Sequence, residues 1–235
     1  MSADGMAMSA MTTPDALGIA ALFVMWTVMM AAMMLPSAAP AIALYGGLVR
    51  KHAERGRTLP AVAIFVAGYL LAWTAFSAAA TLVQAALQHF MLLDAMMASS
   101  SKALSASLLA AAGLYQLTPL KDRCLANCRE PVAFFIAHWR SGAAGALRMG
   151  IRHGAYCVGC CAGLMLALFA VGVMSVTWMA VAGAVILAEK ALPLPRRAPQ
   201  ALAVALAAAG IWVAAAPASV PGLVQPGAAP MRPMR

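Results

Sequence analysis

Residues 154–188 form a run of 35 residues without one charged side chain. A helix needs about 20 apolar residues to cross the hydrocarbon core of a bilayer, so the run is too long for one span and long enough for two. Gly172, Ser175 and Thr177 lie near its middle and favour a turn. The run therefore predicts a helical hairpin.

The composition of the chain is that of an integral membrane protein. Of its 235 residues, 64% are hydrophobic and only 10% are charged, whereas soluble domains are about 45–50% apolar and about 25% charged. A soluble monomer of this size could not cover so much apolar surface. The composition excludes a cytosolic enzyme, a disordered protein and a secreted disulfide scaffold.

Other apolar runs predict membrane-spanning helices at residues 17–35, 60–83, 103–119 and 200–216. With the hairpin, they predict an all-α, polytopic membrane helix bundle of six transmembrane helices over residues 17–216. The flanking residues 1–16 and 217–235 are predicted to be disordered. Pro36 and Pro40 follow the first run and predict a kink or a break where that helix continues.

The segments between the runs are more polar. Residues 84–102 predict a short helix or loop at the outer interface. Residues 121–153 predict loops with an interfacial helix, because Phe134, Phe135 and Trp139 lie among basic side chains.

Basic residues are distributed unevenly among these segments. The net charge is +9, and all but three of the sixteen Lys and Arg residues lie in residues 50–57, 121–153 and 190–197. Because cytoplasmic loops carry an excess of Lys and Arg, the bias places both termini on the outer side of a membrane that the chain crosses several times. Orientation in the lipid bilayer explains the positive charge better than binding to nucleic acid.

Five cysteines are the first chemical signal: Cys124, Cys128, Cys157, Cys160 and Cys161. All fall near the predicted cytoplasmic side, where thiols stay reduced. The spacings C-x3-C and C-x2-C-C let each group share one helix face. Grouped thiolates select soft metals such as Cu(I) or zinc, whereas single cysteines in membrane helices are more often packing residues. The two groups predict one shared soft-metal site.

Methionines of the first span are the second signal. Met25, Met29 and Met33 form one helical stripe, and Met30 and Met34 form another. Thioethers are soft neutral ligands for Cu(I), although methionine also fills space in apolar helices. Beside the cysteines, the methionines favour Cu(I) over zinc as the bound metal.

Three further residues have two interpretations each. His153 lies four residues before Cys157 and is either a further metal ligand or a packed core histidine. Glu189 and Lys190 end an apolar run, where charges either reach the interface or pair inside the bundle. Signatures such as G-x-S-x-G and H-E-x-x-H are absent from the sequence, so catalytic activity is left open.

Three segments resemble a known family. They are residues 25–42, residues 113–131 and residues 154–179, followed by the residues AEK at 188–190. Together they resemble the bacterial family called predicted metal-binding integral membrane proteins, a domain of unknown function. The resemblance implies a multi-pass protein of the bacterial inner membrane. It also implies that the cysteines, the five methionines, Pro36, Glu189 and Lys190 are motif positions. Ala162 departs from the family pattern, in which an aromatic residue follows the cysteine pair.

The favoured hypothesis is an integral membrane protein that handles Cu(I), with a metallochaperone or a membrane protein as its partner. A thiol-redox membrane enzyme that exchanges disulfides among the same cysteines is the first alternative. A non-catalytic membrane scaffold or assembly subunit is the second.

The charge bias predicts the topology of the chain. Reporter fusions at residues 55 and 145 should report a cytoplasmic location, and a fusion at residue 94 should report an outside location. Labelling of residue 145 from outside intact cells, with residue 94 protected, would overturn this topology.

Overall fold

The computed structural model describes residues 16–52, 58–90, 102–172, 175–192 and 197–215. Within these ranges every regular element is an α-helix, which confirms the all-α class. The helices are α2 (Ala16–His52), α3 (Thr58–His89), α4 (Lys102–Gln116), α5 (Pro119–Arg129), α6 (Pro131–His138), α7 (Gly142–Val171), α8 (Val176–Ala191) and α9 (Ala198–Ala215). Of the termini predicted to be disordered, residues 1–16 and 217–235, Ala16 is instead the first residue of α2, and the others lie outside the described residues.

The described helices do not divide into six equal spans. By length and composition, α2, α3, α7 and α9 could each cross a membrane, and α4 with α5 forms a fifth candidate that is bent by 63°. Alone, α4 has 15 residues and α8 has 16, which at 1.5 Å per residue is shorter than a hydrocarbon core of about 30 Å. Four or five candidates therefore replace the six predicted spans.

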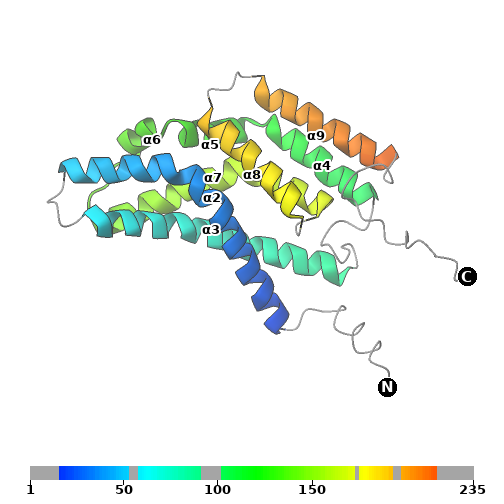
Figure 1. Ribbon diagram of the computed structural model, residues 1–235, viewed down its shortest axis with the longest axis horizontal. Coiled ribbons are helices and arrows are strands. Elements are labelled where there is room, and N and C mark those ends of the chain that lie inside the picture. Colours follow the sequence, from blue (N-terminus) through cyan, green and yellow to red (C-terminus); the bar gives the residue numbers. More distant parts are fainter. Residues whose placement is uncertain (1–15, 53–57, 91–101, 173–174, 193–196, 216–235) are drawn as a thin grey trace, which may run out of the picture.

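Helix α2 continues through both of its prolines, so of the predicted kink or break the structure shows the kink. Pro36 and Pro40 lie inside this one helix, and Figure 1 shows that it is bent, with its N-terminal part projecting away from the other helices. The carbonyl of Met34 accepts hydrogen bonds from Ser37 Oγ at 2.9 Å and from Tyr69 OH at 3.1 Å. Such side-chain bonds stabilise a bent helix around proline.

Two predicted boundaries shift. Helix α3 ends at His89 instead of residue 83, because Gln84 is buried and accepts a hydrogen bond from Trp26 Nε1 at 2.6 Å. Residues 91–101 of the predicted outer segment lie outside the described residues. Helix α7 begins at Gly142 instead of residue 154, because its basic side chains, such as Arg148, lie on an exposed face.

The break within residues 154–188 falls where the sequence predicts it. Gly172 ends α7 with φ = 103°, a conformation that favours glycine. Ser175 is the N-cap of α8 and accepts a hydrogen bond from the Trp178 N–H at 3.5 Å. Two helices therefore meet at this turn.

Helix α7 is the central helix of the bundle and contacts α3, α4, α5 and α8. Its glycines Gly150 and Gly154 stand one turn apart and face α3. A Cβ atom at Gly150 would collide with the carbonyl oxygen of Phe65, and one at Gly154 would lie 2.7 Å from the Cβ atom of Ala72. Small residues spaced in this way let two helix backbones touch.

The contact between α3 and α7 predicts which glycines cannot be replaced. Gly150→Val should lower the free energy of unfolding by about 2 kcal/mol or more, because the obstructing atom is a backbone carbonyl that cannot turn aside. The measurement is denaturant unfolding of the purified protein. Gly47→Ala is the matched control, since no atom lies within 4 Å of a Cβ atom there, and it should raise stability by about 0.5–1 kcal/mol. Equal effects of the two changes would contradict the close contact.

Candidate metal centre

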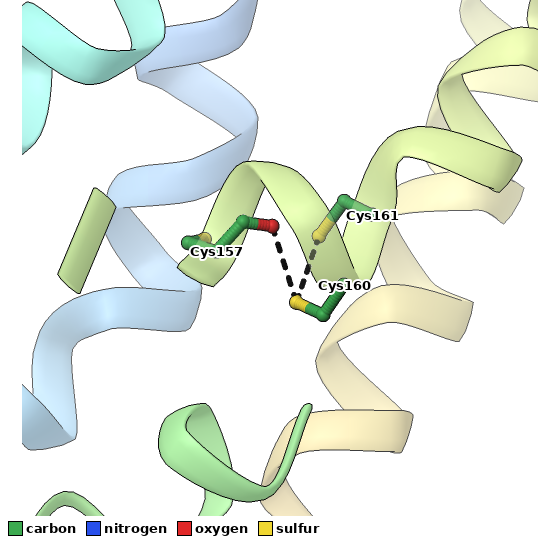
Figure 2. A group of neighbouring side chains, drawn as sticks. All are labelled: Cys157, Cys160 and Cys161. Carbon is green, nitrogen blue, oxygen red and sulfur yellow. Dashed lines mark hydrogen bonds between the residues drawn. The ribbon is translucent and has the colours of Figure 1, made fainter. Parts of the chain in front are cut away.

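Three cysteines of α7 gather their thiols in the centre of the bundle. Cys157, Cys160 and Cys161 are all buried, and their Sγ atoms lie within 4.8 Å of one another. Figure 2 shows Cys160 hydrogen-bonded to both other cysteines: its Sγ lies 3.5 Å from Cys161 Sγ and donates to the carbonyl of Cys157 at 3.1 Å. The three residues are one helical turn of α7, as their spacing predicts.

A fourth thiol comes from another helix. Cys128 of α5 is half-buried, and its Sγ lies 3.8 Å from Cys160 Sγ. Sulfur atoms bound at about 2.3 Å to one tetrahedral metal are about 3.8 Å apart. The two predicted cysteine groups therefore meet through Cys128, at a spacing that suits a common metal ion.

Cys124 is buried one turn before Cys128 but packs differently. Its Sγ lies over the Cα of Gly159, where a Cβ atom would be only 2.6 Å away. Tyr115 of α4 also contacts Gly159: its OH donates a hydrogen bond to the Gly159 carbonyl at 2.5 Å. Gly159 therefore lets α5 approach α7 closely enough for Cys128 to reach Cys160.

Helix α5 is held in place by a buried ion pair with α8. Thr118 caps the start of α5, and Lys121 inside its first turn is fully buried. The ammonium of Lys121 lies 2.6 Å from the Glu189 carboxylate and also donates to Gln116 Oε1. At the other end of α5, Arg129 Nε donates to the carbonyl oxygen of Glu189 at 2.5 Å. Both ends of the helix are thus tied to one residue.

Lys190, the next residue of α8, points into the cysteine group. Its ammonium donates to Cys157 Sγ at 2.9 Å and to Ser37 Oγ of α2 at 3.2 Å. Of the two interpretations of Glu189 and Lys190, pairing inside the bundle is the one the structure shows. A cation at this position offsets the negative charge of a metal–thiolate complex, and buried charges need such a partner.

His153 lies near the thiols without joining them. Its side chain is buried among aromatic rings, with ring centroids 5.1 Å from Phe134 and 6.0 Å from Tyr69. Among the described residues, the group with ligand atoms within 4.8 Å of each other does not include this histidine. Its Nδ1 atom is buried and has no hydrogen-bond partner.

The two methionine stripes have different surroundings. Met30 and Met34 are fully buried in the same core cluster as the α7 cysteines. Members of the other stripe pack at the edge of that cluster and are only half-buried: Met25, Met29 and Met33. The stripe of Met30 and Met34 is therefore the one that shares the buried core with the cysteines.

Sequence reasoning missed two residues of this centre. Lys121 was expected in a polar loop. The signal in the sequence is that Lys121 and Glu189 each lie next to an apolar run and carry opposite charges. Tyr69 was overlooked within its span, although a buried tyrosine OH needs a partner. Its OH contacts both the Met34 carbonyl and Cys157 Sγ, each at 3.1 Å.

The buried ion pair predicts a non-additive response to mutation. Lys121→Met should lower the free energy of unfolding by about 3–5 kcal/mol, because it leaves the Glu189 carboxylate buried and unpaired. The double variant Lys121→Met/Glu189→Leu should lie within about 1 kcal/mol of the wild type. Denaturant unfolding measures both values. Arg123→Met, on the exposed face of α5, is the matched control. Additive losses in the double variant would argue against the pair.

Comparison with known proteins assigns the chain to a family described by copper handling. A sequence model of the PpoB2 family, described as copper chaperone, matches residues 23–213. It confirms the metal-related part of the family resemblance found in the sequence, while the membrane part stays a prediction. No curated protein and no solved structure matched the chain. Because the matched residues cover most of its length, the chain belongs to the PpoB2 family of copper chaperones.

Proposed function

We propose that this protein is an integral membrane copper chaperone that binds Cu(I) through the thiols of Cys128, Cys157, Cys160 and Cys161. One observation carries the proposal. The Sγ atoms of Cys128 and Cys160 lie 3.8 Å apart, although 32 residues separate them in the chain. Packing alone does not require the thiol of Cys128 on α5 to lie beside the group of three thiols on α7.

Copper fits the surroundings of the thiols better than zinc. Cu(I) is soft and is bound by thiolate and thioether sulfur, and the fully buried Met30 and Met34 share a core cluster with the cysteines. A Cu(I) ion with three thiolates carries a net charge of −2. The Lys190 ammonium, 2.9 Å from Cys157 Sγ, offsets part of that charge.

The outer surface of the bundle supports a location in a membrane. Large apolar side chains stand exposed on α3 and α9, including Leu59 at 82%, Leu82 at 68% and Ile211 at 71% exposure. Soluble monomers rarely expose large contiguous apolar patches. In the proposed orientation the copper site opens toward the cytoplasm of a bacterial cell, where a metallochaperone or a membrane protein exchanges Cu(I) with it.

The proposed ligands predict how copper binding responds to substitution. Cys128→Ser and Cys160→Ser should each weaken Cu(I) binding by at least about 100-fold, because even a lost outer-shell partner of a metal site costs about 10–100-fold in affinity. Competition with a chromogenic Cu(I) chelator, under anaerobic conditions, measures the affinity.

Cys124→Ser is the matched control for these variants. It removes a buried thiol from the same helix as Cys128, but one that packs on Gly159, so Cu(I) binding should be kept. Met30→Leu should lower the affinity for Cu(I) without changing the weaker affinity for zinc. A wild-type protein that binds no Cu(I), but whose cysteines cycle through a disulfide at a measurable potential, would support the thiol-redox enzyme instead.

A further inference from the structure

A cavity of about 230 Å³ leads from the surface of the protein to the thiols. It lies among α2, α5, α7 and α8. Its rim includes the exposed residues Pro40, Leu187 and Ala191, and its inner wall includes Cys128 and Cys157. Copper that reaches the cysteines through this cavity needs no rearrangement of the helices.

Two residues in the wall of this cavity carry an unpaired polar atom. Arg129 Nη2 and His153 Nδ1 are buried without a hydrogen-bond partner, and the whole His153 residue is only 3% exposed. Nearly all buried polar groups in proteins are hydrogen-bonded, so each exception calls for an explanation. Two residues with such atoms in one cavity wall, beside the thiols of Cys128 and Cys157, make that wall polar, and a polar molecule is the occupant that suits it.

The charge of the cavity selects an anion. Arg129 and Lys190 are both part of the lining, which includes no carboxylate among the residues that the structure describes. The nearest acid of α8, Glu189, is already paired with Lys121. The Lys190 ammonium has three donors and uses two of them, on Ser37 and Cys157.

We propose that this cavity binds the copper donor as a small anionic thiol complex of Cu(I), a proposal that rests on the copper chaperone function. The carboxylate of the carrier lies beside the charged guanidinium of Arg129 and accepts a hydrogen bond from the remaining Lys190 donor, and its sulfur presents copper to Cys157 and Cys128. A volume of about 230 Å³ equals that of roughly eight waters in the liquid. The carrier is therefore a molecule of amino-acid size.

The transfer is a ligand exchange without oxidation or reduction. A bond forms between Cu(I) and the sulfur of Cys157, and the bond between Cu(I) and the carrier sulfur breaks. The proton of the Cys157 thiol passes to the departing carrier thiolate. Copper remains Cu(I) throughout, and the carrier leaves as a free thiol.

Three carriers with the same two-carbon thiol chain and end groups of different charge test the proposal on the full-length protein. Cu(I) is supplied as its complex with 3-mercaptopropionate, which is anionic, with 2-mercaptoethanol, which is neutral, or with cysteamine, which is cationic. The loading rate from the anionic carrier should exceed the rate from the neutral one by about tenfold, equivalent to about 1.4 kcal/mol. The cationic carrier should load most slowly.

The three carriers also differ in their own chemistry, so the ratio of loading rates from the anionic and the neutral carrier is compared between the wild type and variants of Arg129. Arg129→Gln should abolish most of the tenfold ratio, whereas Arg129→Lys, which keeps the charge, should retain it. Arg123→Gln removes the same charge from the exposed face of α5 and should leave the ratio unchanged. Circular dichroism and the final amount of Cu(I) bound verify that each variant is folded.

Two results would overturn the inference while leaving the copper function intact. One is equal loading of the wild type from the anionic and neutral carriers, to a full complement of Cu(I). The other is a ratio that survives in Arg129→Gln. Failure of the wild type to bind Cu(I) from any carrier would instead overturn the proposed function itself.

Discussion

The buried ion pair between Lys121 and Glu189 is the interaction on which the position of the fourth thiol depends. Removing two charges from water is expensive, and an apolar pair of similar volume is often as stable. What the ion pair provides is register: it fixes the start of α5 on α8, and Arg129 fixes the end of α5 on the same residue. With both ends held, Cys128 has one position, 3.8 Å from Cys160 Sγ.

Helix α7 combines two kinds of small residue on different parts of its surface. Gly150 and Gly154 bring its first half against α3, and the three cysteines follow in the next turns. Gly159, between those cysteines, admits α5 in the same way that Gly150 admits α3. The absence of Cβ atoms at these positions therefore places α3 and α5, and these helices supply Tyr69, beside His153, and Cys128.

How much the sequence could predict depended on whether a feature was local. The break at Gly172 and the shared face of Cys157, Cys160 and Cys161 follow from turn chemistry and helical periodicity, and both are seen. The 63° bend between α4 and α5 and the burial of Lys121 were missed, because both depend on tertiary partners, above all Glu189. A basic residue beside apolar runs was taken as a sign of the cytoplasmic face, a rule that ignores pairing within the bundle.

A copper chaperone must hold its cargo and also release it, and in the proposed site the ligands differ in the access they allow. Cys160 and Cys161 are buried on one central helix, whereas Cys128 is half-buried and comes from α5. Cys128 and Cys157 line the cavity that reaches the surface. Under the proposed function, an incoming thiol would meet these two sulfurs first, and copper would exchange at the cavity while Cys160 keeps hold of it. Stepwise replacement of one sulfur at a time would avoid a free Cu(I) ion, and Lys190, which is hydrogen-bonded to Cys157, would stay beside the negative charge at each step.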